Sequence, residues 1–156
     1  MHGEEHEAKT QVTRRMLTAL LSGVIDRACA TPMLAARWKL LVVLEALGGL
    51  RIGEATGGGD YHGLLANNMS IITSSEGTET VEAKIEHSKT GRSRFVNFAA
   101  VTAVSQIDAA SIVRKYWRSC DLKVTRVWEA GYWIERPDYV VVRVNLLAVT
   151  DRLPSL

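Results

Sequence analysis

The chain has 156 residues, of which 47% are hydrophobic and 23% are charged, and its formal net charge is +2. This size and composition fit a single domain over residues 1–156 that needs neither disulfides nor metal to bury a core. The sequence excludes a membrane-spanning helix, because no apolar run reaches the ~20 residues that a span requires. The acidic start Met1–Glu5 is unlike a secretory signal. Cys29 and Cys120 lack a CxxC spacing, so we expect reduced thiols in an intracellular protein.

Charge is distributed unevenly along the chain. Residues 1–80 contain 7 Lys and Arg against 9 Asp and Glu, whereas residues 81–156 contain 12 against 8. The second half is therefore basic and could face phosphate groups. An ordinary solvated surface explains the same distribution, and charge alone does not separate the two interpretations.

The first two predicted elements are helices. The segment His6–Ala30 has the period of an amphipathic helix. Its apolar stripe contains Val12, Met16, Leu20 and Val24, joined by Leu17, Leu21 and Ile25. Thr31 and Pro32 mark the start of a second helix, because a capping hydroxyl precedes proline at the first helical position. That helix is apolar nearly all round as far as Leu47, which predicts a position at the centre of the domain.

Short strands are predicted in the middle of the chain. Gly48 and Gly49 end the apolar helix, and Arg51–Thr56 can form one more helical turn before the glycines that follow it. Apolar–polar alternation and the intervening polar turns predict three strands. These are Met69–Thr73, Val81–Glu86 and Arg94–Phe98. We expect them to form an antiparallel sheet of about three strands.

Another helix and a hairpin are predicted in the second half. The helix is Ser105–Cys120, and its buried face contains Ile107, Ala110, Val113 and Trp117. After it, Ala130 and Gly131 separate the two arms of a hairpin, Val124–Trp128 and Tyr132–Ile134, and Tyr139–Val144 is a further β run. The predicted fold class is α+β, mainly helical around one buried helix, with a small antiparallel sheet along one edge.

Arg51 is the first candidate functional residue. Its guanidinium offers five donors in a rigid fork that matches two oxygens of a phosphate. A preceding buried helix would fix its position, as a precise phosphate contact requires. Glu54 lies three residues later on the same helical face and could orient the guanidinium. A surface Arg–Glu pair of little energetic consequence is the alternative.

Lys89 is the second candidate, in the polar turn His87–Arg94 between two predicted strands. Arg92 and Arg94 lie close to it in the sequence, so the turn could face phosphates. A lysine there can also donate a proton to a leaving oxygen. A solvated hairpin tip, where lysine, threonine and glycine are common, accounts for the same residues.

Taken in order, the segments Leu44–Glu54 and Val81–Val96 resemble the arginine and lysine regions of the tyrosine recombinase (phage integrase) catalytic domain. The resemblance covers roughly residues 10–120. It implies a fold like that of DNA breaking and rejoining enzymes, and strand cleavage and rejoining in site-specific recombination or integration. In that reaction Arg51 contacts the scissile phosphate, supported by Glu54, and Lys89 protonates the leaving 5′ oxygen.

The same resemblance predicts how the protein meets its substrate. Duplex DNA is the partner, with Arg92 and Arg94 among the DNA-binding residues, and homo-oligomers on DNA are consistent with it. It implies no metal, no small-molecule cofactor and no membrane partner, and a location with DNA in a nucleoid or nucleus. We expect weak duplex binding that falls steeply with salt.

The chain also departs from the recombinase pattern. No histidine follows Lys89, so the His-x-x-Arg box is missing, and no tyrosine is identified as the nucleophile. We interpret Tyr116 and Tyr139 as packed aromatics. The sequence therefore predicts the N-terminal part of a catalytic domain that is inactive by itself. The alternatives are a non-catalytic DNA-binding or interaction module that retains the scaffold, and an unrelated small-molecule enzyme.

Tryptophans and cations are interleaved near the hairpin. The residues concerned are Trp117, Trp128 and Trp133, with Arg118, Lys123 and Arg126 between them. Such a mixture can stack on nucleic-acid bases, but core and hairpin packing explains it as well.

Overall fold

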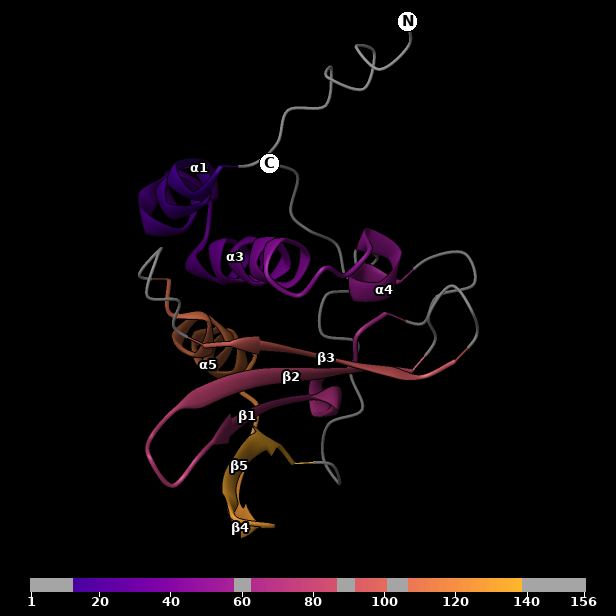
Figure 1. The fold of residues 1–156 in the computed structure, drawn as a ribbon. Coiled ribbons are helices and arrows are strands. Elements are labelled where there is room, and N and C mark those ends of the chain that lie inside the picture. Colours follow the sequence, from indigo (N-terminus) through magenta and orange to yellow (C-terminus); the bar gives the residue numbers. More distant parts are fainter. Residues whose placement is uncertain (1–12, 58–62, 87–91, 101–106, 139–156) are drawn as a thin grey trace, which may run out of the picture.

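A five-stranded antiparallel sheet carries helices on one side in the computed structural model (Figure 1). The structure describes residues 13–57, 63–86, 92–100 and 107–138. The helical elements are α1 (Arg14–Ala19), η2 (Leu20–Val24), α2 (Ile25–Ala28), α3 (Pro32–Ala46), α4 (Ile52–Thr56), η3 (Ala66–Asn68) and α5 (Ala109–Ser119). The strands are β1 (Met69–Thr73), β2 (Glu79–Ile85), β3 (Arg94–Ala99), β4 (Val124–Glu129) and β5 (Tyr132–Pro137).

The strand order in the sheet is β3-β2-β1-β5-β4. The three strands predicted from alternation are present and pair as expected, but the predicted sheet of about three strands is too small. After α5 the chain returns and β5 pairs with β1, with Ile71 opposite Glu135. This pairing joins residues 60 to 64 positions apart in the sequence, so no local pattern indicates it.

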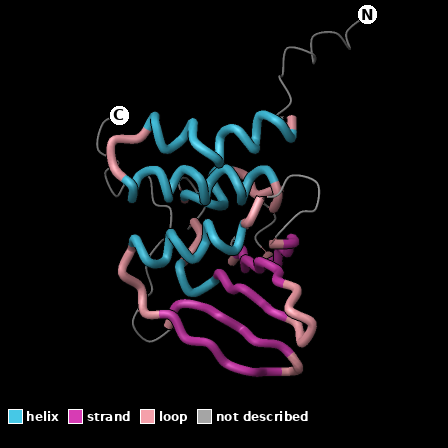
Figure 2. Tube along the Cα trace, turned by 90° about the vertical axis from the view of Figure 1, so that its left-hand side faces the viewer, coloured by secondary structure: helices cyan, strands magenta, loops and turns pink. Residues whose placement is uncertain are grey.

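The helices form a stack on the sheet. Figures 1 and 2 show α5 nearest the strands, α3 above it, and α1 and α2 as the outer tier. The position of α3 in the middle explains why it is apolar nearly all round, and the prediction of a central helix is confirmed. The side chain of Thr31 caps it, since Thr31 Oγ1 accepts a hydrogen bond from the N–H of Leu34 at 3.1 Å.

The first helical segment buries only part of the stripe that its sequence predicts. Leu17 and Ile25 are buried, whereas Met16 and Val24 are 43% and 40% exposed. Residues eight apart drift by about 80° around a pure α-helix. The π-helical segment η2 is wound more loosely and reduces this drift. As a result Leu17 and Ile25 share the face that meets α3.

One face of the sheet is packed against the helices. Val81, Ala83 and Ile85 alternate inward along β2 and are buried, as the sequence predicted. Four residues predicted for the buried face of α5 are also buried: Ile107, Ala110, Val113 and Trp117. The helix itself begins later than expected, at Ala109, where the Asp108 carboxylate accepts from the N–H of Ser111 at 3.0 Å.

The predicted hairpin is present, and its turn consists of Ala130 and Gly131. Both residues have positive φ, 54° and 87°, which is the conformation of a type I′ two-residue turn. The β run Tyr139–Val144 lies outside the residues that the structure describes.

Candidate functional site

Two glycines fix the position of Arg51 relative to the sheet. Gly49 has a φ of +68°, which reverses the chain at the end of α3 and lets the Leu50 N–H donate to the Leu44 carbonyl at 3.2 Å. A Cβ on Gly48 would lie 2.7 Å from that carbonyl and 3.2 Å from Cε1 of Phe98. Glycine is therefore required for α3 to end this close to β3.

Arg51 is the capping residue of α4. Its backbone is extended, with φ −77° and ψ 150°, and its side chain is exposed. The Arg51 carbonyl accepts the first helical hydrogen bond from Ala55 at 3.2 Å, and the Arg51 N–H donates to Glu54 Oε1 at 3.0 Å. Both backbone polar groups are thus held, while the guanidinium is exposed on the surface.

Glu54 is a buried carboxylate, only 3% exposed. The same oxygen, Oε1, also accepts from Nη2 of Arg94 at 2.7 Å. A charge buried to this degree is costly without a partner, and Arg94 supplies the partner from the first residue of β3. One oxygen therefore connects the start of α4 to the start of β3.

The five predicted site residues have different outcomes. Arg51 is exposed, and Glu54 contacts it through the backbone N–H, whereas the sequence suggested the guanidinium. Arg94 was expected to face DNA and pairs with Glu54, although 42% of its side chain stays exposed. Arg92 is exposed. Lys89 lies outside the described residues, so the predicted approach of Arg51 and Lys89 stays a prediction.

No local feature of the sequence indicates the Glu54–Arg94 pair. The two residues are 40 positions apart, and each looks like an ordinary surface charge when its own element is considered alone. Only the approach of α4 to β3 brings them together. Above the sheet, α4 lies over the end where β2 finishes and β3 begins (Figure 1).

A second cluster of charges joins α5 to two strands. Arg114 donates from Nε to both Glu135 oxygens at 3.1 Å, and from Nη2 to Glu135 at 2.9 Å and to Glu79. The hydrogen bonds with Glu135 and Glu79 raise the pKa of the Arg114 guanidinium above its ordinary value. Because all three side chains are occupied with one another, the cluster is structural rather than a site for a ligand.

The two described tyrosines are differently placed. Tyr116 is 1% exposed, and burial raises the pKa of its hydroxyl above the usual range. This fits the interpretation of Tyr116 as a packed aromatic. Tyr132 is exposed on β5, which β1 and β2 separate from β3 and the Arg51 site.

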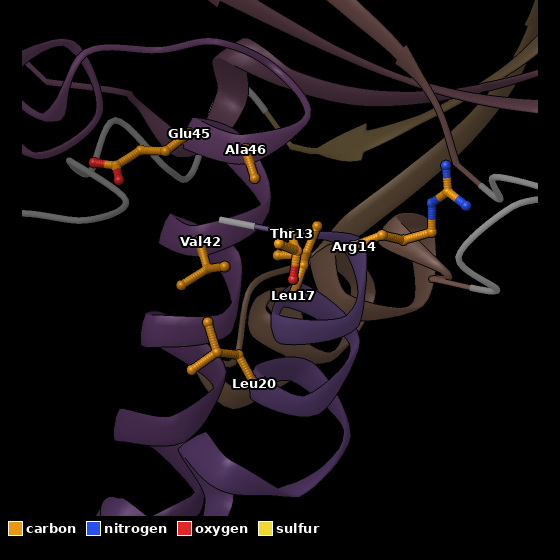
Figure 3. A pocket seen from close by; sticks show the side chains of 7 residues that line it. All are labelled: Thr13, Arg14, Leu17, Leu20, Val42, Glu45 and Ala46. Carbon is orange, nitrogen blue, oxygen red and sulfur yellow. The ribbon is translucent and has the colours of Figure 1, made fainter. Parts of the chain in front are cut away.

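A hollow of about 450 Å³ lies between α1 and α3, and none of the candidate residues lines it. Leu17, Leu20 and Val42 provide apolar lining (Figure 3). Arg14 and Glu45 extend away from these apolar side chains on opposite sides. The hollow therefore lacks the convergent polar groups that a catalytic pocket needs.

Cys29 and Cys120 are free thiols. Within the described ranges, no cluster of three His, Cys, Asp or Glu side chains could hold a metal ion, and no helix is long and apolar enough to cross a membrane. Comparisons with protein-family models, curated proteins and solved structures found no match to this chain.

Proposed function

We propose that this chain is part of a tyrosine-recombinase-like catalytic domain, with a fold of the DNA breaking and rejoining type, and that it binds the phosphates of duplex DNA. In this reaction a tyrosine attacks the scissile phosphate, the bond to the 5′ oxygen breaks, and Lys89 protonates that oxygen. Arg51 contacts the phosphate and stabilises the charge that develops on it, so protein cations do the work of a metal ion.

The observation that carries this proposal is the shared oxygen of Glu54. It holds the backbone of Arg51 and the guanidinium of Arg94 at 3.0 and 2.7 Å. Lys89 lies between β2 and β3 in the sequence. The Glu54–Arg94 ion pair joins the start of α4 to the start of β3. It therefore supports a site in which Arg51 and Lys89 contact one phosphate at this end of the sheet.

The exposure of Arg51 is a second support. An arginine with a rigid backbone and an exposed guanidinium is pre-organised to bind a phosphate through two parallel hydrogen bonds. Arg92 is a further exposed cation, and it lies two residues before Arg94 at the start of β3. Such a surface binds DNA mainly by releasing counterions.

The test is a titration of fluorescent duplex DNA with wild type, Arg51→Gln and Arg118→Gln at several salt concentrations. Arg118 is an exposed arginine on α5, so its substitution removes the same charge elsewhere. We expect Arg51→Gln to weaken binding by about tenfold and to reduce the salt slope by about one. If both variants lose the same DNA affinity, the loss comes from the change in net charge and not from the position of Arg51. No binding of wild type at low salt would refute the proposal.

A non-catalytic DNA-binding module is the second candidate. It is favoured by the two described tyrosines, since one is buried and the other lies on a distant strand. A nicked suicide duplex, which traps covalent intermediates, separates the candidates. We expect binding without a covalent adduct from this chain alone. An adduct mapped to a tyrosine by peptide mass spectrometry would instead establish strand cleavage and name the nucleophile.

A further inference from the structure

The strand β4 is the last strand of the sheet within the described residues. Among the described residues it pairs with β5 on one side and with no strand on the other. Figure 1 shows it at the end of the sheet farthest from α3 and α4. An edge strand presents unpaired backbone N–H and C=O groups, and natural proteins usually protect such an edge with charged side chains, especially lysine, with proline or with a covering element. The sequence of β4, Val-Thr-Arg-Val-Trp-Glu, contains neither proline nor lysine, and its charges are one arginine and one glutamate of opposite sign.

The side chains of this edge are large and exposed. Trp128 is 52% exposed and Val127 is 41% exposed, and they lie on opposite faces of the strand. Trp128 meets Trp133 edge-on at 5.3 Å between ring centroids, and the Arg126 guanidinium carbon lies 4.4 Å from the centroid of Trp133. Apolar area is thus available above and below any strand that adds to β4.

The opposite edge, β3, is less accessible. At its start Arg94 pairs with Glu54 of α4, and Phe98 lies against Gly48 at the end of α3. These contacts bring the helical layer to that edge on one face. At the β4 edge Val124 packs against the core, but Val127 and Trp128 are exposed, so a further strand can add beside the second half of β4.

The hairpin turn determines which backbone groups of β4 point outward. Because the turn has two residues, Glu129 and Tyr132 form its closing hydrogen-bonded pair. Bonded pairs then alternate, so Val127 directs its backbone groups towards β5. The N–H and C=O of Arg126 and Trp128 therefore point to the open edge.

We propose that β4 pairs antiparallel with β4 of a second copy of this chain, with Val127 opposite its own counterpart at a two-fold axis. The occupant is a second copy because the strand is complementary to itself in this register. Arg126 of each copy lies opposite Trp128 of the other, where both direct their backbone groups outward and exchange two hydrogen bonds. Thr125 of each copy lies opposite Glu129 of the other.

The neighbouring registers are less favourable. Directly opposed residues of two antiparallel strands point to the same face of the sheet, and successive residues alternate between faces. In a two-fold pair of identical strands, one residue must therefore lie opposite its own counterpart. Centring on Arg126 would oppose two guanidinium groups, which destabilises a strand pair. Centring on Trp128 would oppose Val127 to Glu129 and leave Arg126 facing the turn. Each Arg126 guanidinium already lies over Trp133 of its own chain. Of these three registers, only the one centred on Val127 also places an aromatic residue of the second copy opposite it.

The first experiment measures the mass of the full chain by sedimentation equilibrium over a range of concentrations. We expect a concentration-dependent dimer. Val127→Lys puts two ammonium groups opposite each other and should raise the dimer dissociation constant at least about tenfold. Tyr132→Lys is the matched control, since Tyr132 lies on the same face and is 47% exposed, but belongs to the inner strand β5. It should leave dimerisation nearly unchanged.

A disulfide tests the register itself. Val127 and its counterpart form a non-hydrogen-bonded pair, in which the Cα atoms lie about 4.5 Å apart, within the range of a disulfide. With Cys29 and Cys120 changed to serine, Val127→Cys should cross-link on mild oxidation. Thr125→Cys should not, because the two copies of residue 125 are about 13 Å apart.

Each outcome bears on the proposal. A chain that stays monomeric at all concentrations overturns it and leaves β4 to another occupant, of which residues 139–156 of the same chain are one. If Val127→Lys and Tyr132→Lys weaken the dimer equally, its interface is not β4. Cross-linking through Thr125→Cys but not Val127→Cys would show a different register. None of these results changes the DNA titration of Arg51→Gln, so the two proposals fail independently.

Discussion

Glu54 makes two interactions, a helix cap and an ion pair, that two different residues usually provide. Its Oε1 satisfies the N–H at the start of α4, which is a capping interaction, and it also neutralises Arg94 of β3. The carboxylate is 3% exposed, so water cannot replace either partner. Glu54 therefore positions Arg51 through the Arg51 backbone N–H and not through its guanidinium.

Two substitutions of Glu54 separate these duties. Glutamine keeps one acceptor oxygen for the Arg51 N–H but loses the negative charge that pairs with Arg94, so we expect Glu54→Gln to reduce the free energy of unfolding by about 1 kcal/mol. Glu54→Ala removes the cap, the ion pair and packed volume together, and should cost about 2–3 kcal/mol. Urea unfolding followed by circular dichroism measures both.

The control for this series is Glu45→Ala, which truncates an exposed glutamate on α3. We expect it to stay within about 0.5 kcal/mol of wild type. If Glu54→Ala were no more destabilising than Glu45→Ala, the carboxylate would not hold α4 to β3, and the support for the proposed site would be lost.

At the scale of elements, residues close together in the sequence predicted the boundaries of individual helices, strands and turns. Thr31 before Pro32 located the start of α3, alternation located β2, and Ala130-Gly131 located the hairpin turn. These signals depend on residues a few positions apart. The pairing of β5 with β1 and the ion pair of Glu54 with Arg94 depend on contacts across the fold, which no local window contains.

The π-helical segment was missed for a different reason. Met16 and Leu17 each belong to an apolar stripe along the predicted helix. An ideal helical period does not indicate which of the two stripes is buried. The loose winding of η2 decides which stripe faces α3. Of the candidate site, the sequence located Arg51 at a helix start with Glu54 beside it, and the structure adds that Glu54 bonds to the Arg51 backbone N–H.

Arg114 connects the helical layer to the sheet, and its removal tests that connection. Arg114→Met leaves Glu79 and Glu135 without their shared cation, and each of the three side chains is only about a quarter exposed. We expect a loss of about 1–2 kcal/mol in the free energy of unfolding, below the cost for a fully buried pair because water screens the charges.

Two further variants make this measurement specific. Lys115→Met removes an exposed charge from the next position of α5 and should change stability by less than about 0.5 kcal/mol. Replacing both carboxylates by glutamine in the Arg114→Met background should recover part of the loss, because no buried charge then lacks a partner. Failure of this rescue would mean that Arg114 stabilises the protein through packing of its aliphatic stem.

On the scale of the whole molecule, the two proposed surfaces lie at opposite edges of one sheet. The Arg51 site adjoins β3 through the Glu54–Arg94 pair, and the dimer edge is β4. Four strand spacings separate β3 from β4, which is about 19 Å. An antiparallel β4 pair would therefore leave both Arg51 sites at the outer ends of a continuous sheet, where each remains open to DNA.

This arrangement predicts that DNA binding and self-association are energetically independent. Sites this far apart with no shared partner usually have additive effects. On a duplex short enough for one chain, Val127→Lys should bind as tightly as wild type, and Arg51→Gln should dimerise as wild type does. The double variant should show the sum of the single effects within about 0.5 kcal/mol. Isothermal titration with short duplexes and sedimentation of the DNA-free chains provide the two readouts. A dimerisation defect in Arg51→Gln would instead mean that the edge near α4 takes part in the contact between copies, and β4 would not be the interface.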